Sequence, residues 1–224
     1  MLPKIIIHNV ISLNGCLTGF EPNLERYYQI AGRYKHDAVL VGSNTAKAGF
    51  EIFLEEIPIE KESDFEKPEN FVNNQVPLWI IPDSRGILQN LLHILRQSEY
   101  CKDVIVLVSK KTPEAYIKYL EKRNYYYIKT GEIHVDFKSV LERLYDDYNI
   151  REIRSDSGGT LNSILLEQGL VDEISLLISP VIVGKGKNYL FGGFKSEKHK
   201  GNLKLIKNEI FDDNSILLVY KIIK

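Results

Sequence analysis

The feature that most narrows the fold of this chain is the regular alternation of short apolar runs with amphipathic stretches. The apolar runs are rich in Ile, Val and Leu and are bounded by Gly, Pro or Asp, which is typical of strands buried on both faces. Strands that alternate with helices in this order form a largely parallel sheet with helices on both faces. The expected strands cover residues 4–10, 38–42, 77–81, 104–108, 125–128, 151–155, 174–178, 203–210 and 215–222.

Four helices are expected between these strands, over residues 24–34, 113–122, 137–147 and 160–168. In the third helix the apolar side chains share one face, and Asp136 is placed to cap the first turn. Gly169 is placed to end the fourth. A short, turn-rich link joins the last two strands, which predicts an antiparallel hairpin. We therefore predict a three-layer α/β/α fold with a twisted, mostly parallel mixed sheet and a C-terminal antiparallel hairpin.

The length of the chain fits one domain. With about 100–200 residues per domain as the usual range, 224 residues predict a single domain over residues 1–224. Residues 55–76 combine many charges with Pro58, Pro68 and the pair Asn73-Asn74, which indicates a long surface insertion within that domain.

Composition excludes several classes of protein. Lys and Arg total 29 against 30 Asp and Glu, a net charge of -1 that gives no general attraction to nucleic acid or to anionic membranes. Cys16 and Cys101 lie far apart, which argues against a disulfide framework or a zinc site of the usual spacing. No stretch approaches the roughly 20 apolar residues of a membrane span, and the N-terminal apolar run is too short for a signal peptide. A cytoplasmic protein without a metal is expected.

The strongest local motif covers residues 155–162, Ser-Asp-Ser-Gly-Gly-Thr-Leu-Asn, between a predicted buried strand and a predicted helix. Glycines at such a junction let the backbone approach a ligand, and free N–H groups at a helix start favour a phosphate. Asp156 lies at the carboxyl end of the strand, where open α/β sheets bind their ligands. The alternative is a tight connection capped by Thr160. The spacing alone does not separate the two interpretations.

Two further segments follow predicted strands in the same way. Ser43 and Thr45, after Val41-Gly42, are suited either to capping a short helix or to binding a phosphate. The segment Asp83-Ser84-Arg85-Gly86 places a hydroxyl beside a guanidinium, yet also forms an ordinary polar turn. Because such segments recur at strand carboxyl ends, a ligand site there is favoured. The five histidines are scattered without ligand spacing, which favours packing or surface positions.

Several motifs together resemble the reductase family of riboflavin biosynthesis, which has a dihydrofolate-reductase-like fold. Ser12-Leu13-Asn14-Gly15 resembles the family's Ser-Leu-Asp-Gly after the first strand, and residues 37–42 with Thr45 resemble its Ala-Ile-Leu-Val-Gly segment and following Thr. Residues 80–84 resemble its Val-Val-Asp-Ser strand end. The longest match joins residues 156–162, 169–173 and 178–184, which resemble Glu-Gly-Gly-Gly-Thr-Leu-Asn, Gly-Leu-Val-Asp-Glu and Ile-Ala-Pro-x-x-x-Gly.

The resemblance implies NADPH as the cofactor and a reaction that converts the ribosylamino group of a 2,5-diamino- or 5-amino-pyrimidinone ribotide 5′-phosphate to a ribitylamino group. Asp156 matches the family glutamate beside the substrate, and Arg33 and Asn14 are the other implied substrate contacts. The pair Gly158-Gly159 resembles the place where related folds carry a cis peptide bond. The implied cofactor contacts are Gly42, Thr45, Ser84, Gly158, Gly159, Thr160 and Leu161.

The resemblance also bears on partners and on pathway position. The chain lacks the zinc deaminase signature that many bacterial relatives carry, so it resembles the stand-alone reductases that act before deamination. Family members are commonly homodimers, for which residues 175–178 and the final hairpin are a candidate interface.

Departures from the family pattern leave two alternatives open. Asn14 replaces the family Asp, Asp156-Ser157 replaces Glu-Gly, and residues 49–53 replace Asp-Asp-Pro-x-Leu. Most of these changes fall among the implied substrate contacts. A dihydrofolate-reductase-like enzyme with a different heterocyclic substrate, and a non-catalytic nucleotide-binding relative, are therefore the other hypotheses.

Overall fold

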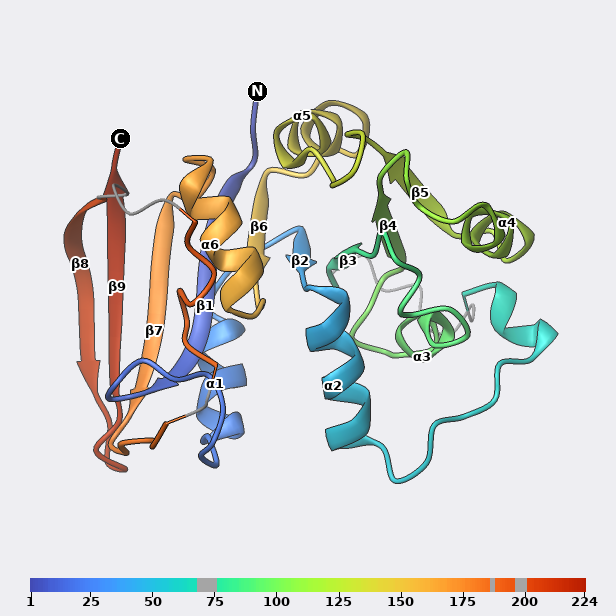
Figure 1. Ribbon diagram of the computed structural model, residues 1–224. Coiled ribbons are helices and arrows are strands. Elements are labelled where there is room, and N and C mark those ends of the chain that lie inside the picture. The colour runs from blue at the N-terminus through green and yellow to red at the C-terminus, as the bar shows by residue number, and fades with distance from the viewer. Residues whose placement is uncertain (68–75, 186–187, 196–200) are drawn as a thin grey trace. The chain divides into compact units, whose positions relative to one another are not determined.

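The computed structural model describes residues 1–67, 76–185, 188–195 and 201–224, and the chain divides into two compact units. The first unit comprises residues 1–3 and 36–151, and the second comprises residues 4–35 and 152–224 (Figure 1). All nine expected strands are present, each within two residues of its predicted bounds. The expected single domain stays a prediction. Part of the expected insertion, residues 68–75, lies outside the described residues.

The first unit is built on four parallel strands in the order β5-β4-β3-β2. One face carries a core of Val and Ile side chains, among them Val39, Ile81 and Val106, covered by residues of α2, α3 and α4. The strands are β2 (Ala38–Leu40), β3 (Leu78–Pro82), β4 (Val104–Val108) and β5 (Tyr126–Lys129), and the helices are α2 (Ser43–Phe53), η1 (Glu62–Phe65), α3 (Leu92–Arg96), α4 (Glu114–Lys122) and α5 (Phe137–Asp147).

The second unit has five strands in the order β6-β1-β7-β9-β8. The central strand β1 is parallel to β6 and to β7, whereas β9 is antiparallel to both β7 and β8. Its elements are β1 (Lys4–Ser12), α1 (Leu24–Ala31), β6 (Glu152–Ser155), α6 (Gly159–Glu167), β7 (Glu173–Ser179), β8 (Asn202–Ile210) and β9 (Ile216–Ile223). The mixed, mostly parallel strands with a C-terminal antiparallel pair confirm the predicted fold class.

Side-chain alternation along β1 places α1 and α6 on opposite faces of these five strands. His8 stacks on Tyr27 of α1, with 4.6 Å between the ring centroids. The next residue, Asn9, accepts a hydrogen bond from the side chain of Asn162 in α6. Because successive side chains of a strand point to opposite faces, the two helices cover different sides of β1.

Two helix ends form as the sequence predicts, whereas α2 and α3 are absent from the four expected helices. The Asp136 carboxylate accepts a hydrogen bond from the Ser139 N–H, and Gly169 adopts φ +66° just beyond α6. Helix α2 was expected only as a short capped segment, but it runs for 11 residues. It contains Gly49, which weakens the local helix signal, and packs Ala46 and Phe50 into the core.

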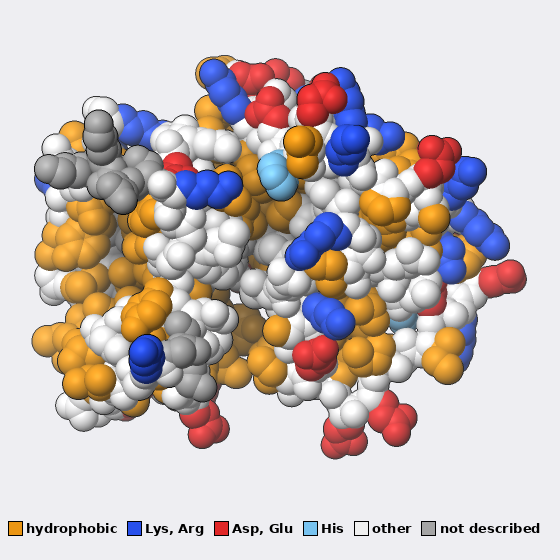
Figure 2. All heavy atoms as spheres, viewed as in Figure 1, with side chains coloured by type: hydrophobic (Ala, Val, Ile, Leu, Met, Phe, Trp, Pro, Cys, Tyr) orange, Lys and Arg blue, Asp and Glu red, His pale blue; other side chains and the backbone are white. Residues whose placement is uncertain are grey.

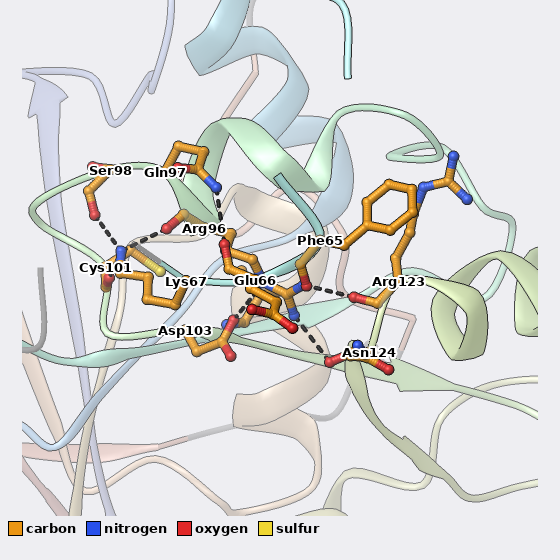
Figure 3. Close-up of polar contacts among 11 residues, drawn as sticks. Phe65, Glu66, Lys67, Arg96, Gln97, Ser98, Cys101, Asp103, Arg123 and Asn124 are labelled. Atoms are coloured by element: carbon orange, nitrogen blue, oxygen red, sulfur yellow. Dashed lines mark hydrogen bonds and ion pairs between the residues drawn. The ribbon is translucent and has the colours of Figure 1, made fainter. Parts of the chain in front are cut away.

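The described part of the insertion is held to the first unit by two charged side chains, the half-buried Lys67 and the buried Arg96. The Lys67 ammonium donates to the carbonyls of Arg96, Ser98 and Cys101 at 2.5–2.6 Å (Figure 3). The buried Arg96 guanidinium in turn donates to the Phe65 carbonyl. These groups lie near the amino ends of β4 and β5, away from the carboxyl ends where the sequence predicts a ligand. This part of the insertion is therefore held in place by hydrogen bonds to the first unit.

A second set of contacts, made by the Glu60 carboxylate, joins the insertion to α4. The Glu60 carboxylate accepts hydrogen bonds from the Tyr119 hydroxyl at 2.9 Å and from the Arg123 guanidinium at 2.5 Å. The side chain of Glu60 is 5% exposed and that of Arg123 is 19% exposed, so water screens this pair poorly.

We expect Glu60→Ala to lower the free energy of unfolding by about 3 kcal/mol, because it leaves a half-buried guanidinium without its partner. Chemical denaturation of the full chain measures the change. Glu114→Ala is the matched control, because Glu114 pairs with Lys118 on the exposed surface of α4. That control should change stability by no more than about 0.5 kcal/mol. If the two variants lose equally little unfolding free energy, the contacts of Glu60 add nothing measurable to stability.

Candidate functional site

The loop between β6 and α6 is fixed through a single carbonyl group. The Ser157 carbonyl accepts hydrogen bonds from the side-chain amides of Asn9 and Asn162, both at 3.1 Å. The Asn162 amide also donates to the Asn9 side-chain oxygen at 2.9 Å, and all three residues are buried. A buried, connected polar network of this kind gives its members one arrangement. The loop that the sequence singled out is therefore positioned by β1 and by its own helix.

Asp156 is the charged residue of this loop, and Arg154 holds it. The guanidinium donates through Nε to one carboxylate oxygen and through Nη2 to the other, each at 2.8 Å. The side chains of Arg154 and Asp156 are 9% and 17% exposed. Burial lowers the pKa of Arg154, but the charge of Asp156, its hydrogen bonds and the nearby tyrosines together outweigh burial and raise that pKa above its usual value. The pair is a fixed, charge-matched unit with a small opening to solvent.

Two tyrosines of α1 stand near this pair. Tyr27 is buried, and its hydroxyl donates to the His8 carbonyl at 3.3 Å. Tyr28 is half exposed and meets the Tyr27 ring edge-on. Burial raises the pKa of both phenols, and the negative charge of Asp156 raises each further. Both hydroxyls therefore keep their protons at neutral pH and act as neutral groups.

His8 lies on the face of β1 that α1 covers, and it is fully buried. Its Nδ1 lies 3.0 Å from the Ser175 hydroxyl, which also accepts a hydrogen bond from the Tyr34 hydroxyl. Burial lowers the pKa of His8 to about 4, in spite of the nearby charge of Asp156. The imidazole is therefore neutral at physiological pH. The packing role expected from the sequence is confirmed for this histidine.

The predicted cofactor contacts of the second unit lie at the start of α6. The helix begins at Gly159, and its N-cap is Gly158, without a side-chain cap. The alternative in which Thr160 caps the helix is therefore wrong, because Thr160 is already inside the first turn. Leu161 is buried, so its backbone is the part suited to ligand contact. The peptide bond between Gly158 and Gly159 is trans, so the expected cis bond is wrong as well.

Gly159 is required by packing. A Cβ atom added there would lie 2.1 Å from the Tyr189 carbonyl oxygen, and one added at Gly193 would lie 2.8 Å from the Thr160 Cα. The Ser163 hydroxyl donates to the Gly159 carbonyl and accepts from the Gly193 N–H. The turn around residues 189–193 thus packs directly on the helix start. The glycines at this junction therefore allow another segment of the same chain, residues 189–193, to approach the helix backbone closely.

The predicted contacts of the first unit lie at the carboxyl ends of two neighbouring strands. Gly42 is the N-cap of α2, again without a side-chain cap, and Thr45 stands in the first turn. Ser84 follows β3, which pairs directly with β2. The buried Asp83 carboxylate accepts from the N–H groups of Ile87 and Leu88 and from the Tyr116 hydroxyl, at 2.9 Å each. The structure therefore brings Gly42, Thr45 and Ser84 to one edge, while Asp83 holds the turn in shape.

Arg33 and Asn14 form their side-chain contacts with residues other than Asp156. Arg33 forms a two-pronged ion pair with Glu209 of β8, the edge strand opposite β6 in the second unit. The Asn14 side chain donates to the Val183 carbonyl at 2.8 Å and accepts from the Val183 N–H at 3.0 Å. Among the described residues, neither side chain forms a hydrogen bond or an ion pair with Asp156. Their role in substrate binding stays a prediction.

Sequence reasoning missed Arg154 and Tyr28. Arg154 lies two residues before Asp156 on a predicted buried strand, and residues at that spacing share one face. A buried arginine needs a charged partner, so the Arg-x-Asp spacing was a usable signal. Tyr28 had no local signal, because its approach to Asp156 depends on how α1 packs against β1.

Two further kinds of feature were sought in residues 1–67, 76–185, 188–195 and 201–224, namely clusters of metal-ligating side chains and long apolar helices. Their His, Cys, Asp and Glu side chains form no group of three or more that could hold a metal ion. None of their helices is long and apolar enough to cross a membrane.

Comparison with known proteins identifies the family. The sequence model of the RibD C-terminal domain matches residues 3–217. The chain belongs to this family. Two relatives of this RibD C-terminal domain carry the name 2,5-diamino-6-ribosylamino-4(3H)-pyrimidinone 5′-phosphate reductase. The protein of Archaeoglobus fulgidus is 26% identical over 194 residues, covering 82% of this chain and 83% of its own. That of Methanothermobacter thermautotrophicus is 28% identical over 192 residues, covering 82% and 81%.

A solved structure supports the same fold for this RibD C-terminal domain. The crystal structure of a pyrimidine reductase-like protein from Corynebacterium diphtheriae superposes with a TM-score of 0.74 at 18% sequence identity. The match covers 99% of this chain and 92% of that one. The resemblance inferred from the motifs is confirmed at the level of family and fold.

The buried His8 predicts a loss of stability in acid. Its pKa is about 4 in the folded RibD C-terminal domain and about 6.5 when unfolded, so the unfolded chain binds more protons between these values. This contribution is fully present above pH 6.5 and is lost as the pH falls towards 4. We expect unfolding free energies of the native chain to drop by about 2 kcal/mol more between pH 7 and pH 5 than those of His8→Gln.

Denaturant titrations at the two pH values measure this difference. His134→Gln is the control, because His134 is exposed and should leave the pH dependence of the native chain unchanged. Equal pH dependence in the native chain and in His8→Gln would show that the buried imidazole does not control acid stability.

Proposed function

We propose that this chain is an NADPH-dependent reductase that converts the ribosylamino group of a pyrimidinone ribotide 5′-phosphate to a ribitylamino group. The observation that carries the proposal is the Asp156 carboxylate, which is fixed beside the start of α6 in a chain of the RibD C-terminal domain family. The names of the two relatives favour the 2,5-diamino form of the substrate over the deaminated form. The enzyme would then act before deamination.

The residues present fit a phosphorylated dinucleotide. Helices α2 and α6 both begin at a glycine N-cap without a side-chain cap, which leaves first-turn N–H groups suited to phosphate oxygens. We propose that Gly42, Thr45 and Ser84 contact the cofactor in the first unit. In the second unit the proposed contacts are Gly158, Gly159, Thr160 and Leu161. When bound, NADPH would supply a hydride to the C1 atom of the ring-opened, imine-like form of the sugar, and a proton from solvent would complete the ribitylamino group.

We propose that Asp156 orients the substrate for this transfer. Its carboxylate oxygens retain acceptor capacity beyond the two bonds from Arg154, so they suit an N–H or O–H donor of the substrate. Tyr28 offers a half-exposed aromatic ring near the carboxylate, which suits contact with a planar heterocycle. Orientation of two bound molecules is the main task in a transfer of this kind.

Arg33 and Asn14 remain proposed substrate contacts. Arg33 is suited to a 5′-phosphate, and its side chain is 42% exposed, so its ion pair with Glu209 can exchange for another anion. Asn14 would contribute to substrate binding indirectly, by holding its loop to Val183 through two hydrogen bonds.

A different heterocyclic substrate is the second candidate. The region that replaces the family Asp-Asp-Pro motif, residues 49–53, continues α2 to its end at Phe53. A proline inside this helix would break it, so the local backbone differs from what the family motif dictates. This observation favours a changed substrate contact while leaving the proposed cofactor contacts intact.

We further propose that the partner of this chain is a second copy of itself. Hydrophobic side chains gather over β8 and β9, at the left in Figure 2. Leu205, Ile206 and Ile210 are exposed on β8, the edge strand of the second unit. An exposed apolar edge strand is suited to association. Sedimentation of the purified chain as a monomer at micromolar concentration would contradict a dimer.

The loss of NADPH absorbance tests the proposed activity directly. Purified chain is mixed with NADPH and with the 2,5-diamino ribotide, the deaminated ribotide or the dephosphorylated 2,5-diamino nucleoside. We expect turnover of the diamino ribotide above all. Asp156→Asn should lower kcat by roughly 100-fold or more while changing NADPH affinity little, since it removes a charged acceptor beside the reacting groups.

Three other results have distinct meanings. NADPH binding without turnover of either ribotide would favour the non-catalytic alternative. Turnover of a different heterocycle alone would favour the second candidate. Equal loss of kcat and of NADPH affinity in Asp156→Asn would remove Asp156 from the substrate side of the site.

A further inference from the structure

We propose that Arg154 is a positioning residue of the active site, which fixes the orientation of Asp156 so that the carboxylate binds a neutral N–H or O–H donor of the substrate. The inference rests on the proposed function and deepens it by naming the kind of group that Asp156 receives.

The geometry leaves the carboxylate little freedom. Arg154 and Asp156 are two residues apart, so their side chains emerge on the same face, and two parallel N–H···O bonds of 2.8 Å join them. Such a paired arrangement fixes the plane of the carboxylate as well as its position. Each oxygen keeps a second acceptor direction that the guanidinium does not use. A substrate group therefore meets acceptors whose directions are set before it binds.

Three described titratable neighbours of the pair, His8, Tyr27 and Tyr28, are uncharged at neutral pH. His8 of β1 faces it with a neutral imidazole, because burial lowers the pKa of that ring to about 4. Tyr27 and Tyr28 of α1 face it as protonated phenols, because burial and Asp156 raise their pKa values. Among these described groups, Arg154 is the one that balances the charge of Asp156. A cationic ligand group would gain little there, whereas a neutral N–H or O–H donor gains a charge-assisted hydrogen bond.

A purely structural ion pair is the competing explanation. Under that explanation Arg154 would stabilise the junction of β6 with the following loop, and turnover by the folded protein would not depend on it. The Ser157 carbonyl already has two side-chain donors of its own, from Asn9 and Asn162. The loop backbone is therefore held independently, and what Arg154 adds is the orientation of the Asp156 side chain.

A double-mutant cycle separates the two explanations. The variants are Arg154→Met, which keeps the side-chain volume, Asp156→Asn, and the two combined. We expect Arg154→Met to lower kcat for the ribotide by about 10–100-fold with the KM for NADPH within twofold. If Arg154 acts through Asp156, the double variant should be no slower than Asp156→Asn alone. Multiplicative losses in the double variant would contradict the proposal.

Arg154→Lys and a remote variant complete the kinetic test. Lys restores the positive charge but not the two-pronged geometry, so we expect it to recover thermal stability while kcat stays at least fivefold below that of the native chain. Full recovery of kcat would show that charge alone matters and would overturn the positioning role. Arg143→Met is the control, because Arg143 pairs with Asp147 on the exposed face of α5. It should leave both kcat and KM unchanged.

A crystal structure of Arg154→Lys, or of Arg154→Met where that variant folds, gives a readout that does not need turnover. We expect the Asp156 carboxylate to rotate away from its native plane or to occupy several orientations. An unchanged carboxylate would refute the inference even if the enzyme is active. If the native chain turns over no ribotide, the proposed function fails, and this structural comparison still decides whether Arg154 positions Asp156.

Discussion

The hydrogen bonds to the Ser157 carbonyl are the interaction on which the candidate site depends. They join β1, the loop after β6 and helix α6 at the point where the chain passes from one face of the strands to the other. Asp156 consequently points to the face covered by α1, while the helix that follows starts on the opposite face. These bonds hold the loop backbone, while Arg154 orients the Asp156 carboxylate and the turn at residues 189–193 packs on the first turn of α6. A small polar network thus sets the geometry of two functional elements.

The charges of this candidate site compensate each other. A carboxylate, a guanidinium, an imidazole and two phenols lie close together, yet burial keeps the imidazole neutral and the phenols protonated. Of these five described groups, Arg154 and Asp156 are therefore the charged ones, and they compensate each other. Fixed dipoles and charges of this kind need little rearrangement when a ligand binds. The same burial that prepares the site makes the protein sensitive to acid.

Much of the fold could be predicted because its signals are local. Short apolar runs bounded by turn residues located every strand, and Asp136 and Gly169 marked the ends of two helices. Helix α2 was underestimated because its helix propensity is weakened by Gly49 and the packing of Phe50 decides its length. The site was predictable only in part. The loop around Asp156 carries a sequence motif, whereas the link from Asn14 to Val183 spans 169 positions and leaves no local pattern.

The activity that we propose is the transfer of a hydride from NADPH to the sugar carbon of a ribotide. The most direct measurement uses NADPH deuterated at both C4 positions of the nicotinamide ring, with mass spectrometry and NMR of the product. We predict one deuterium at C1 of a newly formed ribityl chain. Deuterium in the pyrimidine ring, or consumption of NADPH without label in the ribityl chain, would show that the chain does not catalyse this transfer.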